Sequence, residues 1–474
     1  MKKVFNWLFA KKVRKIVFIT LSSIMSLLLL ITILGVSMYT YGMNYKDKAP
    51  DKVEVKHYEM ETIKSVGKAL YDKDGNKIQL KGVNFGNWLN QEGWMSVNSI
   101  GPMLNEDGSY VKINDQGTVE EYLETPQEDI NLALKNNPNL TDEQIEELWN
   151  IYYDAYCQEI DFKNIKDSGL NMIRLPMYYR NFMEGDDDNL VMKEKPFERI
   201  DWFLEMAKKY DLYVILDMHG VPGGQNGYEH SGTFKVDFWD NQTYIDSICL
   251  LWSEIAKHYK NDRPDLSGVI AAYDLINEPD GKKSATGRKQ WDVMDQIYDA
   301  IREVDKDHVI SVEGCWYFIS LPDPEEYGWE NMLYQYHFYN WFRPTVTYDM
   351  FYTLQFLTMS VSDYDVPKYV GEFTFFNDKT DWIKWLNQYD QMGWNWSFWN
   401  YKTCTPGWWD SSWGMYVQRL HLYDGNLKLD LRTATYDEIK AVWADEGTID
   451  LNGNQNYEPG LLIEILNEYF EQAK

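Results

Sequence analysis

Short apolar runs alternate with amphipathic stretches along most of the chain after residue 68. Some runs are continuous, such as Tyr213-Val214-Ile215-Leu216, which is typical of parallel strands buried on both faces. We expect eight strands, at 82–85, 172–175, 212–216, 269–275, 308–312, 332–337, 368–370 and 395–398. Apolar residues recur at helical spacing between them, for example Ile245, Ile248 and Trp252. This spacing predicts helices over 141–153, 156–168, 198–210, 241–260, 288–304, 346–361, 379–391 and 460–472.

Eight strands with intervening helices predict an α/β protein with a closed (β/α)8 TIM barrel. An open doubly wound sheet is the alternative. Such a fold would be expected to carry a glycine-rich, nucleotide-binding turn after an early strand. Neither GxGxxG nor GxxxxGK occurs in the sequence. Residues 97–150 form a polar insertion after the first strand. No stretch rich in Pro, Gly or Ser separates a further domain, so we expect residues 68–474 to form one domain containing that insertion.

The amino-terminal region predicts a membrane anchor. Four basic residues at positions 11–15 precede an uncharged run whose apolar centre is Ile16–Met38. A helix of that length spans the ~30 Å hydrocarbon layer. The alternative is a cleaved signal peptide, but its apolar region is usually about 7–15 residues, and Gly35-Val36-Ser37 is a poor cleavage site.

We therefore expect a single-pass protein of the cell membrane. The basic flank predicts a cytoplasmic segment at 1–15, followed by a transmembrane anchor at 16–38. A polar stalk at 39–67 then leads to an extracellular domain at 68–474.

Charge and composition narrow the function classes. The chain has 46 Lys and Arg against 74 Asp and Glu, a formal net charge of −28. A protein with this much negative charge repels the phosphates of nucleic acids, which argues against a nucleic acid as its partner. The 20 Trp and 35 Tyr suit neutral ligands with apolar faces, such as sugars, although a large core also uses aromatic residues. The four cysteines at 157, 249, 315 and 404 lack the close spacing of a zinc site or disulfide framework.

Polar residues follow the predicted strands at the end where barrels carry their functional groups. Buried charges that meet at one barrel mouth are costly unless they are paired. Two of these residues are glutamates, the groups used for glycoside hydrolysis. In chain order the strand ends carry Arg174, Asp217, His219, Asn277, Glu278, His337, Tyr339, Glu372 and Trp399.

This series resembles glycoside hydrolase family 5, the cellulase-type family of retaining β-glycosidases, over roughly residues 68–473. Asn277-Glu278-Pro279 matches its acid/base motif. The resemblance implies double displacement with Glu278 as acid/base and Glu372 as nucleophile. It also implies that neither a metal nor an organic cofactor is needed. The implied substrate-binding residues are Arg174, His219, Asn277, His337, Tyr339 and Trp399.

Two segments are similar to the exo-β-1,3-glucanase branch of that family. One is the run His-Gly-Val-Pro-Gly-Gly-Gln-Asn-Gly at 219–227, closed by Ser231-Gly232, and the other is 82–88, where Asn87 replaces a glycine usual in that branch. The implied substrate is a β-glucan or gluco-oligosaccharide. The alternatives are a β-1,4-glucanase, a β-mannanase, a glycolipid β-glycosidase or a catalytically silent carbohydrate-binding barrel. Three tryptophans beyond the last strand either stack on sugar or pack the tail: Trp408, Trp409 and Trp413.

Overall fold

The computed structural model consists of two compact units. One contains residues 1–46 and 340–361, and the other contains 47–339 and 362–474. The residues that the structure describes are 2–96, 125–281, 288–314, 321–340, 347–361, 363–404, 413–418, 430–446 and 458–472.

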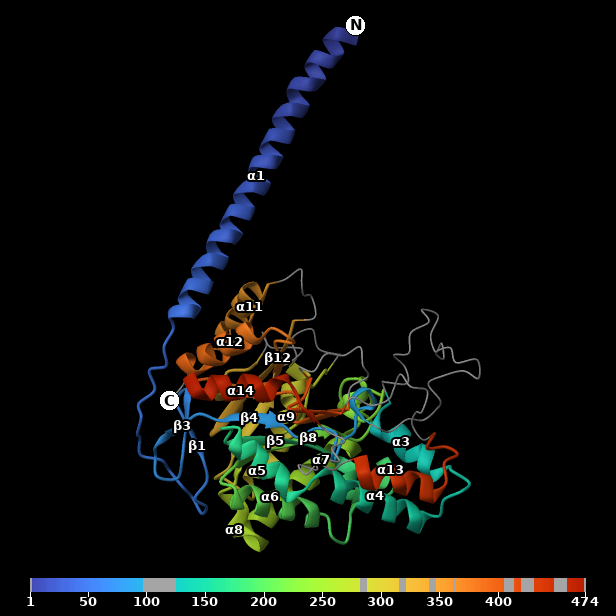
Figure 1. Ribbon diagram of the computed structural model, residues 1–474. Coiled ribbons are helices and arrows are strands. Elements are labelled where there is room, and N and C mark those ends of the chain that lie inside the picture. The colour runs from blue at the N-terminus through green and yellow to red at the C-terminus, as the bar shows by residue number, and fades with distance from the viewer. Residues whose placement is uncertain are drawn as a thin grey trace. The chain divides into compact units, whose positions relative to one another are not determined.

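The larger unit is built around a closed barrel of eight parallel strands (Figure 1). The strands follow one another around the barrel in chain order, and the last pairs with the first. The predicted (β/α)8 fold is therefore confirmed. The strands are β4 (Lys81–Asn84), β5 (Met172–Tyr178), β8 (Tyr213–Gly220), β9 (Ile270–Asp274), β10 (Val309–Glu313), β11 (Met332–Tyr339), β12 (Lys368–Thr374) and β13 (Asn395–Phe398).

Five of these strands extend beyond their predicted ends, among them β5, which continues to Tyr178, and β10, which is longer by the one residue Glu313. β8 continues through His219 to Gly220, β11 through Tyr339 and β12 through Thr374. The predictions stopped where the apolar run stopped, but the backbone ladder continues through the polar residues. Several of the polar residues expected after the strands therefore lie within them, where the barrel holds them rigidly.

Helices connect the strands at nearly the predicted positions. Four helices were not predicted, those over 127–135, 264–267, 324–327 and 436–446, and two of them have only four residues. The helices of this unit are α3 (Gln127–Lys135), α4 (Asp142–Tyr156), α5 (Glu159–Asp167), α6 (Glu198–Lys209), α7 (Gln242–Lys257), α8 (Pro264–Ser267), α9 (Arg288–Arg302), α10 (Pro324–Tyr327), α12 (Lys379–Met392), α13 (Tyr436–Glu446) and α14 (Leu461–Gln472).

A three-stranded antiparallel sheet closes the amino-terminal end of the barrel. It comprises β1 (Lys64–Val66), β2 (Ala69–Tyr71) and β3 (Lys77–Ile78). Ile63 and Leu70, from around these strands, share a buried apolar cluster with barrel residues such as Met172 and Leu333. This closure leaves the carboxyl-terminal end as the open mouth.

The segment expected as a stalk, 39–67, differs from a free linker. It contains the end of the first helix and β1. The Asp307 carboxylate accepts hydrogen bonds from the backbone N–H groups of Tyr58, Glu59 and Met60, at 2.6–3.0 Å. This part of the segment is therefore fixed to the barrel before residue 68.

Smaller sheets complete the unit. β6 (Met183–Glu184) pairs with β7 (Val191–Met192), and β14 (Lys402–Cys404), β15 (Tyr416–Gln418) and β16 (Glu458–Pro459) form a third sheet. α13 packs on α4, where Trp149 and Trp443 have ring centroids 4.8 Å apart. Within the predicted insertion at 97–150, residues 97–124 lie outside the described residues.

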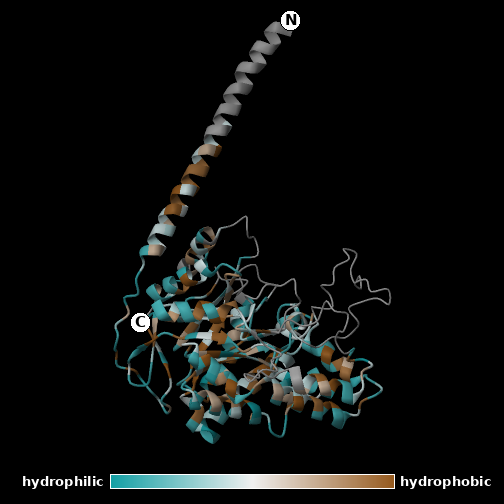
Figure 2. Ribbon diagram, viewed as in Figure 1, coloured by the Kyte–Doolittle hydropathy of each residue, from teal (hydrophilic) through white to brown (hydrophobic). Residues whose placement is uncertain are grey.

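The smaller unit contains α1 (Lys2–Asn44) and α11 (Tyr348–Val361). Ser23–Asn44 of α1 is long and apolar enough to cross a membrane, with mean hydropathy 1.9 and no buried residue in its most apolar stretch of 18 residues. Figure 2 shows the apolar residues along this part of the helix. Length and composition of this kind also fit a signal sequence near an amino terminus.

Candidate active site

Arg174, on β5, is fully buried at the centre of a polar network inside the barrel. Its Nη1 donates to Glu372 Oε1 at 2.9 Å, and its Nε donates to Asp274 Oδ2 at 2.9 Å. Its Nη2 donates to Asn277 Oδ1 at 2.8 Å and lies 3.0 Å from Asp217 Oδ1. A guanidinium stays protonated and has five N–H donors in a fixed plane. Arg174 therefore offsets the charge of several carboxylates and holds Glu372 and Asn277 in place.

Glu278 and Glu372 converge at the open mouth of the barrel. Glu278 follows β9 and Glu372 lies on β12; they are 9% and 6% exposed, so both reach the surface of the site. One oxygen of each and one ring nitrogen of His337 lie within 4.8 Å of one another. Tyr339 Oη donates to Glu372 Oε2 at 2.8 Å. Two carboxyls this close can act on opposite sides of one sugar carbon, one as nucleophile and one as proton donor.

Trp399, which follows β13, stacks on His219, with ring centroids 5.6 Å apart and planes at 20°. Burial and the Arg174 charge hold the pKa of His219 well below its usual range. The neutral ring donates through Nδ1 to Asp217 Oδ2 at 2.6 Å, and its Nε2 accepts from Asn277 Nδ2 at 3.3 Å. The imidazole thus fixes the Asn277 side chain and supports the indole of Trp399.

The structure brings all eight predicted site residues into one connected group. His337 completes it, because its Nδ1 lies 2.9 Å from Glu278 Oε1 and 3.6 Å from Glu372 Oε2. The roles assigned to these residues stay predictions. The group comprises Arg174, His219, Asn277, Glu278, His337, Tyr339, Glu372 and Trp399.

His230, which was not predicted, also belongs to this site. It lies in a short 3-10 helix, Glu229–Ser231, in the loop after β8. Its Nε2 is 3.0 Å from Glu278 Oε2, and its ring stacks on Tyr228 with centroids 5.7 Å apart. The residue stands inside the loop quoted above, and it is one of only seven histidines in the chain. The small number of histidines in the chain was therefore the one sequence feature that could have drawn attention to His230.

Glu92 was also not predicted. It lies in the loop after β4 and is 5% exposed. Trp94 Nε1 donates to its Oε2 at 2.7 Å, while its Oε1 lies 3.8 Å from His219 Nε2. Burial raises the pKa of Glu92 to about 7. A third carboxyl therefore lies beside His219, whose ring stacks on Trp399.

Glu313 is a third unpredicted residue, at the carboxyl end of β10, and it is fully buried. Its Oε2 accepts from the backbone N–H of Glu278 at 2.6 Å, and its Oε1 lies 3.3 Å from His337 Nδ1. Burial and the adjacent Glu278 charge raise the pKa of Glu313 well above its usual range. Glu313 does not face the open site, so it acts on Glu278 through the backbone.

An aromatic wall borders Tyr339. Trp413 stacks on its ring with centroids 5.9 Å apart and meets Trp94 edge-on at 5.2 Å. Trp413 and Trp399 are both 3% exposed, so it is the contacts of Trp413 with Tyr339 and Trp94, rather than its burial, that indicate packing. Trp408 and Trp409 lie outside the described residues.

The two catalytic candidates differ in their charge. Burial raises the pKa of Glu372 to about 7, although His337 and Arg174 oppose this effect. Burial also disfavours the charged form of Glu278, but the His230 cation and the hydrogen bonds from His230 and His337 hold its pKa well below its usual range. In turn, burial lowers the pKa of His230, but the Glu278 carboxylate raises it to about 9. In the substrate-free site at neutral pH, His230 is therefore a protonated imidazolium and Glu278 is an ionised carboxylate.

Glu278, His337 and Glu372 offer the donor atoms of a metal site. The positive charge beside them already comes from Arg174 on Glu372 and from His230 on Glu278. Each carboxylate in this trio therefore has a protein cation as its partner.

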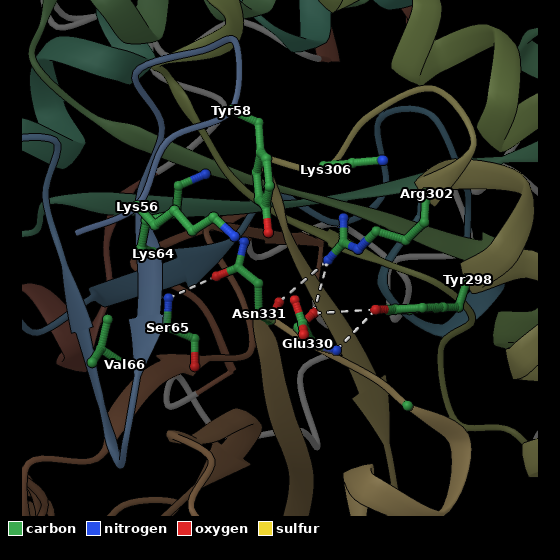
Figure 3. Close-up of a pocket in the computed structure, with 11 residues that line it drawn as sticks. Lys56, Tyr58, Lys64, Ser65, Val66, Tyr298, Arg302, Lys306, Glu330 and Asn331 are labelled. Atoms are coloured by element: carbon green, nitrogen blue, oxygen red, sulfur yellow. Dashed lines mark hydrogen bonds between the residues drawn. The ribbon is translucent and has the colours of Figure 1, made fainter.

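A separate cavity of about 460 Å³ lies beside β1 and the start of β11, at the amino-terminal end of the barrel (Figure 3). Its wall is tied together by Ser65 N–H donating to Asn331 Oδ1 at 2.8 Å and by Arg302 Nη2 donating to the Glu330 carbonyl at 3.1 Å. None of the predicted site residues lines it. This end of a barrel is usually concerned with stability rather than chemistry.

The family model described as Cellulase (glycosyl hydrolase family 5) matches residues 128–404. A β-xylosidase of Phanerodontia chrysosporium is 31% identical over 288 residues, which cover 60% of this chain and 53% of that protein. Glucan 1,3-beta-glucosidase 2 of Wickerhamomyces anomalus is 29% identical over 49% of this chain and 48% of its own length. The chain thus spans about half the length of these curated relatives. Among solved structures, an endogalactoceramidase shares the fold, with TM-score 0.50 and 15% identity over 73% of this chain and 76% of its own.

Proposed function

We propose, because this chain belongs to glycosyl hydrolase family 5, that it is a retaining β-glycosidase that acts by double displacement. One observation carries the proposal: an oxygen of Glu278 and an oxygen of Glu372 lie within 4.8 Å, with Arg174 bonded to the second carboxylate. This spacing leaves no room for a water between the carboxyls, as an inverting enzyme would need.

Glu372 is the nucleophile in this proposal. Its carboxylate attacks the anomeric carbon and forms the glycosyl-enzyme bond. Arg174 and Tyr339 both donate to it, and these hydrogen bonds favour the charged form and aim one oxygen at the sugar.

Glu278 is the acid and then the base. As the glycosidic bond breaks, the proton of His230 passes across their 3.0 Å contact to Glu278 and on to the departing oxygen, which leaves the imidazole neutral and Glu278 ionised. Once Glu372 is esterified its charge is lost, and Glu278 accepts a proton from the attacking water. The water then displaces Glu372 and leaves the anomeric configuration retained.

The remaining residues bind the sugar at the cleavage point. Asn277, fixed by Arg174 and His219, is placed to hydrogen-bond the 2-hydroxyl, a contact that strengthens at the transition state. Trp399 forms the floor under the ring, because an indole face packs well against the apolar face of a sugar.

We propose a β-linked glucan or gluco-oligosaccharide as substrate. Support comes from the resemblance of the loop after β8 to the exo-β-1,3-glucanase branch and from relatives named glucan 1,3-beta-glucosidase. The relative named β-xylosidase favours a second candidate, a β-xyloside. Xylose lacks the hydroxymethyl group of glucose, so the contacts around that group decide between them.

Two measurements test the proposal. Hydrolysis of aryl β-glucoside, aryl β-xyloside and β-1,3-, β-1,4- and β-1,6-glucans should give the fastest turnover on a β-glucoside or β-1,3-glucan. Proton NMR of the first product should show the β-anomer. A first-formed α-anomer would overturn the retaining mechanism, and faster turnover of the xyloside would select the second candidate.

We further propose that α1 holds the protein in the cell membrane, with residues 1–15 inside and the barrel outside. The apolar stretch Ser23–Asn44 and the six basic residues before position 16 support this orientation. The intact chain should remain in the membrane fraction after a high-salt wash. Secreted protein whose amino terminus lies near Ser37 would instead establish a cleaved signal peptide.

A further inference from the structure

The outward face of α11 is apolar. Met350, Leu354 and Leu357 are 60%, 52% and 40% exposed. Their spacing of four and three residues puts them on one face of the helix. Within the described residues outside α1, no other helix exposes more than one large apolar side chain. A surface helix normally turns polar residues to solvent, so this face calls for an apolar partner.

The opposite face of α11 is mostly apolar too: Phe351, Tyr352, Phe356 and Met359 are buried there, together with the uncharged polar residues Gln355 and Thr358. The whole helix contains no Lys or Arg, and its one acidic residue, Asp349, stands in its first turn. By contrast, α7 exposes the single apolar Leu250 on a face with polar Thr243 and Asp246. A helix that is apolar on both sides is typical of one surrounded by apolar material.

α11 lies beside the carboxyl end of the apolar stretch of α1 (Figure 1). The Phe356 ring is 5.6 Å from Tyr41 and 6.5 Å from Tyr45, measured between centroids. At Gly42 an added Cβ would lie 3.0 Å from the Phe356 ring, so the glycine permits this close approach. Tyrosines at the end of an apolar span are typical of the membrane–water boundary.

We propose that α11 is a second membrane contact, lying in the outer surface of the bilayer with Met350, Leu354 and Leu357 among the lipid chains. The inference rests on the proposed anchor, because α1 is what places α11 at the boundary. Its occupant is phospholipid rather than a protein, since α11 packs through Phe356 on Tyr41 and Gly42 of the same apolar stretch that is proposed to cross the membrane. Without basic residues α11 does not need anionic headgroups, so neutral phosphatidylcholine should suffice.

Photo-crosslinking in the full chain tests this directly. Benzoylphenylalanine replaces Leu354, and the protein is reconstituted in phosphatidylcholine vesicles, irradiated and examined by mass spectrometry of its peptides. We expect phospholipid adducts on the peptide that contains position 354. The same probe at Leu250 of α7, which is 43% exposed, is the matched control and should give no lipid adduct above background.

A third probe position separates this inference from the anchor. Benzoylphenylalanine at Leu29, in the apolar stretch of α1, should also give lipid adducts. Adducts at Leu29 but not at Leu354 would overturn the inference alone, whereas none at either position would overturn the anchor as well. A crosslinked dimer through position 354 would assign the face to a second copy of the chain and would also overturn the inference. An unchanged thermal unfolding midpoint shows that the probe leaves the fold intact.

Discussion

His230 Nε2 lies 3.0 Å from Glu278 Oε2, so an imidazole and the proposed acid/base carboxyl share one proton. The Glu278 carboxylate raises the pKa of His230 to about 9 against the opposing effect of burial, and the His230 cation holds the pKa of Glu278 well below its usual range. The proposed acid therefore stands ionised beside its own proton source. In the proposed mechanism, acid catalysis begins when that proton moves from His230 to Glu278.

This relationship predicts a bell-shaped pH dependence of kcat/KM. Activity should rise through about pH 7, where Glu372 loses its proton and becomes a nucleophile. It should fall through about pH 9, where the His230–Glu278 pair loses the proton needed by the leaving group. In His230→Asn only the carboxyl can bind that proton, and a carboxyl without the imidazole is the weaker base. The falling limb should therefore move to lower pH.

The control for this experiment is His258→Asn. His258 pairs with Asp201 at 3.0 Å, and neither residue belongs to the site. Its profile should match that of the unmodified protein. A falling limb that stays near pH 9 in His230→Asn would show that His230 does not hold the proton.

Glu313 offers a prediction about positioning. Glu278 has a φ of 39°, a conformation that residues other than glycine rarely adopt, and its backbone N–H donates to Glu313 Oε2 at 2.6 Å. Glu313→Ala leaves that buried N–H without its acceptor, at a cost of about 1–3 kcal/mol, so kcat should fall roughly tenfold to a hundredfold. Glu313→Gln keeps a carbonyl acceptor and should retain most of the activity. Equal losses in the two variants would show that the acceptor is not what matters.

Trp399 should be the main stacking platform. Trp399→Ala removes the floor beneath the sugar and uncovers His219, and we expect a loss of at least ~2 kcal/mol of transition-state stabilisation in kcat/KM. Trp413→Ala should cost less, because Trp413 packs against Tyr339 and Trp94 and does not stack on the His219 ring as Trp399 does. If both substitutions have equal and small effects, the platform lies elsewhere.

Asp307 should be important for stability. It pairs with Lys64 at 2.6 Å, the two side chains are 1% and 5% exposed, and it also accepts three backbone N–H groups from residues 58–60. Asp307→Ala leaves a buried cation unpaired, at about 3–5 kcal/mol in the free energy of unfolding. Denaturant unfolding measures this change. Asp167→Ala, which breaks the exposed pair with Lys163, should leave the transition unchanged.

The sequence pattern predicted the barrel and the eight residues that meet at its mouth, because parallel strands in a closed barrel bring their carboxyl ends together. Arg174 and Glu372 are 198 residues apart, yet that rule alone places both at one end of the barrel. The same rule would have found Glu313 at the end of the fifth strand. It was missed because no family motif drew attention to that strand.

His230 and the segment before residue 68 mark where sequence patterns stop being informative. His230 reaches Glu278 because its loop turns back over the site, and no periodicity describes the path of a loop. Residues 58–60 looked like a polar linker because their contact with Asp307 uses backbone N–H groups, which leave no trace in side-chain pattern. The unusual apolar face of α11 is similar, since its residues read as an ordinary buried helix until their exposure is known.

The roles of the two glutamates can be separated by the leaving group. Substitution of either should badly impair action on a polysaccharide, so loss of activity alone cannot assign them. An activated aryl leaving group needs no proton, so Glu278→Ala should still form the glycosyl-enzyme on Glu372 and then release it slowly, because no base activates water. Azide needs no base and should restore turnover, giving the β-glycosyl azide. Glu372→Ala should form no intermediate, and azide should give the α-azide by a single inverting displacement. Arg174 and Tyr339 both hold Glu372, while His230 and His337 hold Glu278, which is the basis of this assignment. A β-azide from Glu372→Ala, or a sugar trapped on Glu278, would reverse it.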